Sequence, residues 1–180
     1  MEKFIAEGHA DCIALGRALL ADPFLPRKAQ AGRDEEITPC LRCGECHSGM
    51  IKNRCIRCSV NPIIGREHEF FHPIPVLRRK KVLVAGGGPG GMQAALTARE
   101  RGHAVVLCEA GPRLGGALKF ADNGADFKIP MLRYRESQIK KLLSSGVEVR
   151  LNTPVDKALV EEIKPDVLIA AVGAEPFILP

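Results

Sequence analysis

Apolar and polar positions alternate most regularly in the second half of the chain. From residue 81 onwards, short β-branched apolar runs of strand length are separated by stretches with the apolar spacing of a helix. Strands are expected at residues 81–85, 104–110, 147–151 and 166–173, and helices at residues 92–102 and 132–146. Strands that alternate with helices predict an α/β fold with a mostly parallel sheet covered on both faces.

The first 37 residues contain too few elements to form a core of their own. The pattern predicts a helix at residues 2–7, a short buried strand at residues 11–15, and then a short turn and one more helix within residues 16–33. No other strand lies nearby in the sequence to pair with residues 11–15. This strand ends at Gly16 and Arg17, as if a ligand bound there.

Residues 38–78 differ from both neighbouring regions because they hold five of the seven cysteines. Towards their end, Pro73 and Pro75 argue against a helix or a central strand. We interpret this region as an irregular segment, held together by a ligand that its cysteines bind, followed by a linker. The predicted organisation is therefore three regions, which are residues 1–37, 38–78 and 79–180.

Composition and charge exclude several classes of protein. The formal net charge is +5, but the basic residues are dispersed apart from one run at residues 78–81, and aromatic residues are few, so we expect no nucleic-acid partner. No apolar run is long enough to span a bilayer, so we expect no membrane association. The odd cysteine count and the lack of a leader-like N-terminus favour a reducing, cytoplasmic location.

A glycine motif follows the first strand of the regular half. Gly86-x-Gly88-x-x-Gly91 comes directly after that strand and opens a helix, and Glu109 stands at the end of the next strand. The first glycine permits a tight turn, the second lets the backbone approach a pyrophosphate, and the third lets helix and strand pack closely. Glu109 suits the hydroxyls of an adenosine ribose. The motif therefore predicts a site for FAD or NAD at the N-terminus of this helix.

The cysteines allow two ligand sets. Cys40, Cys43, Cys55 and Cys58 have a spacing that fits tetrahedral zinc. A [4Fe-4S] cluster instead fits the set of three close cysteines and one distant cysteine, Cys40, Cys43, Cys46 and Cys58. The cluster set is favoured because the zinc set leaves Cys46 without a role and because zinc carries no electrons beside a nucleotide-binding fold.

The glycine loop, Glu109, a second glycine pair at Gly115 and Gly116, and the late stretch DVLIAAVGAEP together resemble the FAD-binding domain of the two-dinucleotide flavoprotein oxidoreductases. This resemblance implies that Gly115 and Gly116 lie near the pyrophosphate of FAD. It also implies that the late stretch leads towards an NAD(P)H-binding domain, for which the sequence contains no second glycine motif.

The order and spacing of all three regions resemble the iron–sulfur flavoproteins of the 2,4-dienoyl-CoA reductase and trimethylamine dehydrogenase group, whose barrel is akin to Old Yellow Enzyme. In that group the last cluster ligand is the cysteine of a C-x-V-N-P stretch, which here is Cys58 in CSVNP, so Cys55 is the extra cysteine. The resemblance implies that residues 1–37 are the last strand and helix of an FMN-binding (α/β)8 barrel. It further implies that Gly16 and Arg17 contribute to the FMN phosphate site.

The function implied by this resemblance is electron transfer from NAD(P)H through FAD, a [4Fe-4S] cluster and FMN to an enoyl-type or related small-molecule substrate. No catalytic acid or base is assigned, because the family places these on earlier barrel strands. The expected partner is either the missing barrel portion as a separate chain or further copies of this chain in a homo-oligomer. The isolated chain is expected to be inactive and to hold FMN poorly. Alternatives are a stand-alone electron-transfer or nucleotide-binding module, a split-enzyme subunit, and a zinc-stabilised binding protein.

Overall fold

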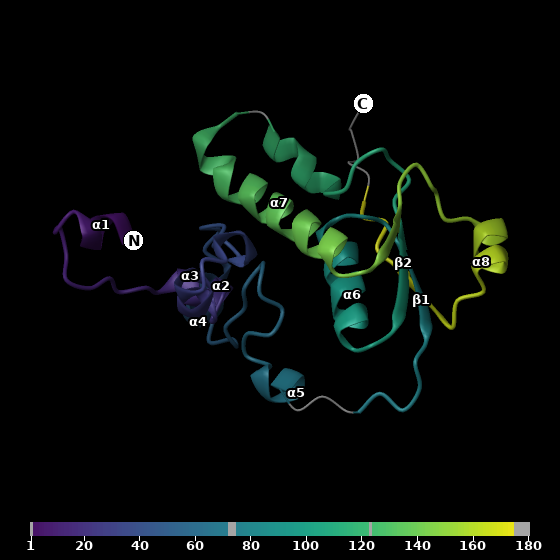
Figure 1. The fold of residues 1–180 in the computed structure, drawn as a ribbon, viewed down its shortest axis with the longest axis horizontal. Coiled ribbons are helices and arrows are strands. Elements are labelled where there is room, and N and C mark those ends of the chain that lie inside the picture. Colours follow the sequence, from purple (N-terminus) through teal and green to yellow (C-terminus); the bar gives the residue numbers. More distant parts are fainter. Residues whose placement is uncertain (1, 72–74, 123, 175–180) are drawn as a thin grey trace. The chain divides into compact units, whose positions relative to one another are not determined.

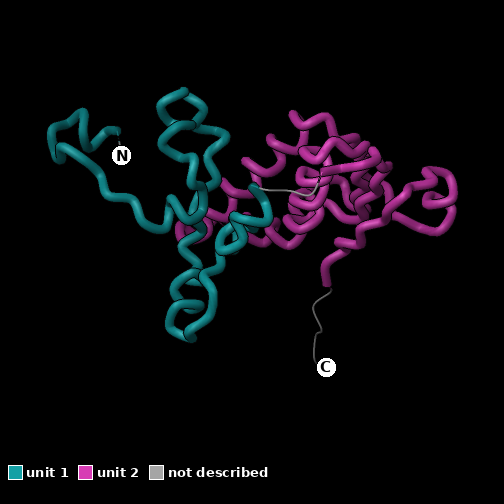
Figure 2. Tube along the Cα trace, turned by 90° about the horizontal axis from the view of Figure 1, so that it is seen from below, with its two compact units in different colours: residues 1–72 teal, residues 73–180 magenta. Residues whose placement is uncertain are grey.

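The computed structural model describes residues 2–71, 75–122 and 124–174, and Figure 1 traces the chain. The chain divides into two compact units, Met1–His72 and Pro73–Pro180, which Figure 2 shows in different colours. We call them the N-terminal unit and the C-terminal unit. None of the helices in the described residues is both long enough and apolar enough to cross a membrane.

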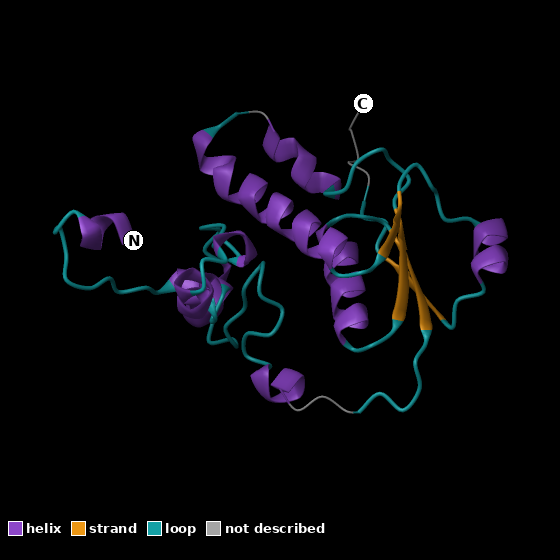
Figure 3. Cartoon of the chain, in the orientation of Figure 1, coloured by secondary structure: helices purple, strands orange, loops and turns teal. Residues whose placement is uncertain are grey.

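The C-terminal unit is built on a four-stranded parallel sheet, drawn in orange in Figure 3. Its strands are β1 (Lys81–Ala85), β2 (Ala104–Cys108), β3 (Glu148–Arg150) and β4 (Val167–Ala170). They lie side by side in the order β3-β2-β1-β4, and every neighbouring pair is parallel. The parallel sheet predicted from the hydrophobic pattern is thus confirmed, with each strand shorter than or equal to its predicted length.

Helices cover both faces of this sheet, as Figure 1 shows. Successive side chains of a strand point to opposite faces, so Val82 and Val84 of β1 pack with α6 (Pro89–Glu100) and α7 (Ile129–Ser144). Leu83 points the other way, towards α8 (Lys157–Ile163). The four residues of β1 that follow the exposed Lys81 are almost fully buried because both sides of the sheet are covered, which explains their continuous apolar run.

The helix boundaries follow local sequence signals. Helix α6 has Pro89 in its first turn, where a missing N–H costs nothing, and is followed by Gly102 with a φ of +87°. Helix α8 was not predicted, although Asp156 caps its N-terminus by accepting a hydrogen bond from the N–H of Leu159 at 2.8 Å. Two short 3-10 segments, Gly116–Asp122 and Asp126–Lys128, lie between β2 and α7.

The N-terminal unit consists of short helices joined by irregular chain. They are α1 (Glu2–Ala6), α2 (Arg17–Ala21), α3 (Leu25–Gln30), a 3-10 turn at Asp34–Glu36, α4 (Glu45–Ile51) and α5 (Glu67–Phe71). The strand predicted at residues 11–15 is wrong: no strand is assigned among residues 2–71. A strand requires a hydrogen-bonded neighbour, and the described residues provide none for this segment.

Two further predictions for this unit need correction. Residues 16–33 form two helices rather than a turn and one helix, because Pro23 follows α2 and the chain turns before α3 begins. The cysteine segment, expected to be irregular, contains α4, which begins after Gly44 in the left-handed region with a φ of +77°. The helix α5 ends at Phe71, ahead of the two prolines that argued against a helix.

Candidate functional site

The glycine loop lies at the C-terminal end of β1, where parallel α/β sheets bind ligands. Gly86 has a φ of +108°, and a Cβ there would collide with the carbonyl oxygen of Ala171 beyond β4. A Cβ at Gly91 would collide with the carbonyl oxygen of Gly86. These two glycines therefore allow the tight turn and the close approach of α6 to the loop.

Gly88 differs from its neighbours because space is free around it. Its φ of −74° is ordinary, and a Cβ there would meet only the Cα of Gly116, at 3.8 Å. Gly88 precedes α6, and its carbonyl accepts the hydrogen bond from Met92 at 2.9 Å. The N–H groups ahead of Met92 in this first turn have no helical acceptor, as at any helix start. The loop thus presents an open cradle that fits a pyrophosphate.

Glu109 follows β2, and backbone N–H groups fix its carboxylate beside the loop. The N–H of Gly87 donates to Oε2 at 2.6 Å, and the N–H of Gly111 donates to Oε1 at 2.8 Å. Each oxygen retains acceptor capacity for a ribose hydroxyl. Gly87 was missed by the sequence analysis; it belongs to the run of three glycines, and a Cβ there would strike Leu114.

The second glycine pair packs directly on the first loop. Gly115 has a φ of +112° and donates its N–H to the carbonyl of Gly87 at 2.8 Å. A Cβ at Gly116 would come within 2.9 Å of the Cα of Gly88. The structure therefore brings together all of the predicted nucleotide-site residues, which are Gly86, Gly88, Gly91, Glu109, Gly115 and Gly116.

A cavity of about 450 Å³ lies next to this loop in the C-terminal unit. Its lining includes Glu109 and Gly116, the apolar side chains of Ile139 and Leu151, and the cation Arg135. Arg135 pairs with Asp122 at 2.6 Å. The size and mixed apolar and cationic lining of this cavity fit part of an adenine dinucleotide.

A second pocket lies within the N-terminal unit and gathers four of the cysteines. It is lined by Cys40, Cys43, Cys46 and Cys58, together with apolar Leu20, Leu41 and Val60. These four cysteines are the set predicted for a [4Fe-4S] cluster. Cys55, the member that distinguishes the zinc set, is exposed and is not among the lining residues. The donor set of this pocket fits a cluster with thiolate ligands and apolar surroundings.

Hydrogen bonds reach two of these cysteine sulfurs, those of Cys40 and Cys43. Sγ of Cys43 lies 3.3 Å from the hydroxyl of Ser59, and the N–H of Arg42 donates to Sγ of Cys40 at 3.4 Å. The hydroxyl of Ser59 and then the backbone amide of Glu45 lower the pKa of Cys43 below its usual value. A lower pKa favours the thiolate, which is the form that binds metal.

The remaining predicted site residues, Gly16 and Arg17, stand at the start of α2. Gly16 is the N-cap residue, and Arg17 lines the cysteine pocket. Assignment of Gly16 and Arg17 to an FMN phosphate site stays a prediction.

Within the part of the chain that the structure describes, no group of three or more His, Cys, Asp or Glu side chains is already spaced to hold a single metal ion.

Comparison with known proteins agrees with this geometry. A family model described as "FAD binding domain" matches residues 81–168. The chain is 44% identical to the NADH oxidase of Thermoanaerobacter brockii over 97% of the chain and 27% of the relative. It is 38% identical to the cinnamate reductase of Clostridium sporogenes over 96% of the chain and 26% of the relative.

Among solved structures, a 2-naphthoyl-CoA reductase in complex with 2-naphthoyl-CoA matches with a TM-score of 0.91 and 32% identity, covering 99% of this chain and 27% of that one. The chain thus spans little more than a quarter of the length of the proteins it matches. The match nevertheless runs through both units, from the short helices to the parallel sheet. Along nearly its whole length the chain is thus similar to one part of these larger enzymes, and the resemblance that its motifs indicated, to the group of 2,4-dienoyl-CoA reductase and trimethylamine dehydrogenase, is confirmed.

Proposed function

We propose that this chain forms the FAD-binding and [4Fe-4S]-binding portion of an NAD(P)H-dependent flavin oxidoreductase that acts on an enoyl-type or related small-molecule substrate. The observation that carries the proposal is the presence, in one chain, of a glycine cradle beside Glu109 and of a pocket lined by four thiols. When bound, FAD would exchange electron pairs with a pyridine nucleotide, and the cluster would pass single electrons between FAD and FMN. The names of the relatives, NADH oxidase and cinnamate reductase among them, support this reaction class.

The residues of the C-terminal unit have separate tasks in this proposal. The backbone around Gly88 and the first turn of α6 would bind the pyrophosphate, because free N–H groups and the helix dipole attract anions. Glu109 would accept hydrogen bonds from the ribose hydroxyls of the adenosine. A carboxylate at this position disfavours a ribose that carries a 2′-phosphate, since the two negative charges repel each other.

The residues of the N-terminal unit would hold the cluster and one edge of an FMN site. The four pocket cysteines would each bind one iron, and Leu20, Leu41 and Val60 would keep water away from the cluster. Gly16 and Arg17 are proposed to contact the FMN phosphate. Because Arg17 also lines the cysteine pocket, this assignment would bring the FMN phosphate near the cluster.

Competition between nucleotides tests the FAD site. We expect the 180-residue chain to bind FAD, with ADP competing because it carries the same adenosine and pyrophosphate, and FMN not competing because it lacks both. Equilibrium titration monitored by flavin fluorescence gives the three affinities. Displacement of FAD by FMN but not by ADP would contradict the assignment of Gly88 and Glu109 to the adenosine diphosphate moiety.

Ser59 provides a prediction for the cysteine site. A cluster-bound Cys43 sulfur is only an acceptor, so the hydroxyl of Ser59, 3.3 Å away, would donate to it and stabilise the more negative reduced cluster. Ser59→Ala is expected to lower the reduction potential of the reconstituted cluster by tens of millivolts, since about 59 mV corresponds to tenfold in a one-electron equilibrium. Ser59→Thr keeps the hydroxyl and should retain the wild-type potential in the same spectroelectrochemical titration. Equal potentials for Ser59→Ala and wild type would show that this hydrogen bond does not act on the cluster.

A further inference from the structure

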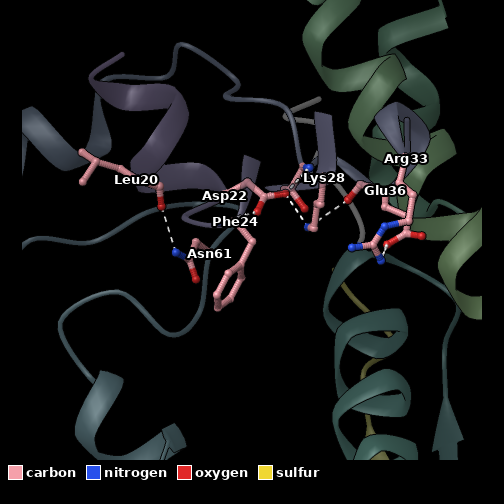
Figure 4. A network of polar contacts seen from close by, with 8 residues as sticks. Leu20, Asp22, Phe24, Lys28, Arg33, Glu36 and Asn61 are labelled. Carbon is pink, nitrogen blue, oxygen red and sulfur yellow. Dashed lines mark hydrogen bonds and ion pairs between the residues drawn. The ribbon is translucent and has the colours of Figure 1, made fainter. Parts of the chain in front are cut away.

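Two polar contacts fasten the two ends of the cysteine segment to the region of α2. At the front end, Oδ2 of Asp22 accepts a hydrogen bond from the N–H of Thr38 at 2.8 Å, and Thr38 lies two residues before Cys40. At the rear end, Nδ2 of Asn61 donates to the carbonyl of Leu20 at 2.8 Å, and Asn61 lies three residues after Cys58. The contacts span 16 and 41 residues of sequence, and the four pocket cysteines lie between the two fastened ends. Figure 4 shows both side chains.

The front contact is built around a buried charge. Asp22 is only 3% exposed, and its carboxylate accepts from the N–H of Phe24 at 3.1 Å and from Nζ of Lys28 at 2.6 Å, in addition to Thr38. Nζ of Lys28 also donates to the carbonyl of Glu36 at 3.1 Å. A buried carboxylate is costly unless it is paired and hydrogen-bonded, and here both conditions are met. Replacing the oxygen Oδ2 of Asp22 by an amide nitrogen would remove the acceptor that the Thr38 N–H uses and the ion pair with Lys28, which would keep only its bond to the carbonyl of Glu36.

The rear contact joins two residues next to the pocket. Leu20, whose carbonyl Asn61 binds, lines the pocket together with Arg17 on the same helix. Oδ1 of Asn61 also accepts from the N–H of Ile63 at 3.0 Å, which fixes the side-chain amide in one orientation. Val60, immediately before Asn61, is 6% exposed and lines the pocket as well. Helix α2 is therefore one wall of the pocket and the anchor for the chain that carries Cys58.

We propose that Asp22 and Asn61 are positioning residues of the cysteine pocket, which hold both ends of the cysteine segment to α2 so that the four thiols face one cavity before a cluster is inserted. This inference rests on the proposed function for the identity of the cluster. Pre-organising the ligands lowers the conformational entropy that cluster binding must overcome. Neither residue is among those that line the pocket, and each acts through the backbone that it fastens.

Isosteric variants test this inference. In Asp22→Asn the charge is lost, and in Asn61→Asp the donor to Leu20 is replaced by an acceptor. Both are expected to incorporate less than the wild-type amount of iron and sulfide on anaerobic reconstitution. The cluster they do take up should be lost to a chelator at least about tenfold faster, and its visible circular dichroism should change because the ligands are held less firmly. Wild-type stoichiometry, loss rate and dichroism in both variants would overturn the proposal.

The matched control is Glu36→Gln. It removes the exposed ion pair between Arg33 and Glu36, 3.0 Å long and also visible in Figure 4, but leaves the carbonyl of Glu36 to accept from Lys28. Exposed pairs contribute little to stability, so this variant should retain its cluster like wild type. A loss as fast as that of Asp22→Asn would show that any weakening of the region suffices, which contradicts a specific role for Asp22. FAD affinity should be unchanged in all three variants, because the C-terminal unit is not altered.

Amide exchange in the metal-free chain separates this inference from the proposed function. The Thr38 N–H should be protected in wild type and should exchange at least about tenfold faster in Asp22→Asn. The Ile63 N–H donates to Oδ1 of Asn61, an acceptor that Asn61→Asp keeps, so the variant for this end is Asn61→Leu, which removes both polar atoms and in which Ile63 should respond in the same way. If Asp22→Asn loses its helices altogether, the Asn61 variants decide whether the fastening holds, because this contact is to a single backbone carbonyl. If the wild-type chain takes up no iron, the proposed function fails. The role of Asp22 and Asn61 as positioning residues is then still supported if the Thr38 and Ile63 amides lose their protection in the variants. It is overturned if the protection of these amides is unchanged.

Discussion

Cys46→Ser is expected to abolish cluster assembly, whereas Cys55→Ser is expected to leave it at the wild-type level. Cys46 is half-buried in the first turn of α4 and lines the pocket with the three other predicted ligands. Removing one of four thiolates leaves an iron without its protein ligand, so iron per chain should fall from about four to near zero. Iron and acid-labile sulfide, measured after anaerobic reconstitution, give the result directly.

Cys55→Ser is the matched control because it changes the same chemical group in the same segment. Cys55 is exposed and is absent from the lining of the pocket. It is, however, essential to the alternative zinc set. If Cys55→Ser loses its metal while Cys46→Ser retains it, the ligand set is the zinc set and the [4Fe-4S] assignment is wrong.

Gly88→Ala is expected to weaken FAD binding by at least about tenfold, or about 1.4 kcal/mol, while the chain remains folded. The new methyl group would stand in the open cradle, where a pyrophosphate must approach the backbone, but would meet no protein atom closer than 3.8 Å. The free energy of unfolding should therefore change by less than about 1 kcal/mol. Flavin fluorescence titration and thermal unfolding measure the two effects separately.

Gly91→Ala provides the contrast. Its Cβ would collide with the carbonyl oxygen of Gly86, so α6 must shift away from the loop and stability should fall by about 1–3 kcal/mol. Gln93→Ala, two residues further along α6, removes only a hydrogen bond to Thr97 and should change neither property appreciably. Wild-type FAD affinity in Gly88→Ala would show that the phosphates do not lie against this glycine.

The sequence was most informative where local pattern and tertiary environment agree. The β-branched run at residues 81–85 becomes a strand because neighbours on both sides satisfy its backbone and helices cover both its faces. The equally apolar run at residues 11–15 has no such neighbours within the described residues and forms no strand. Strand propensity is therefore insufficient without a pairing partner.

Other features required information that spacing does not contain. The start of α4 depends on Gly44 in a left-handed conformation, and its cysteine, histidine and glycine residues are weak helix formers. The hydrogen bond from Thr38 to Asp22 crosses 16 residues, and no short motif reveals such a pair. By contrast, Asp156 before an apolar segment was a readable cap signal for α8 that the analysis missed.

Simultaneous measurement of iron, sulfide, zinc and FAD in one sample tests the central claim most directly. The 180-residue chain would be reconstituted anaerobically with iron, sulfide, equimolar zinc and FAD, and then separated from unbound material. The account predicts about four iron, about four sulfide and one FAD per chain, with little zinc. Stoichiometric zinc without iron, or a chain that retains the cluster but no FAD, would contradict it.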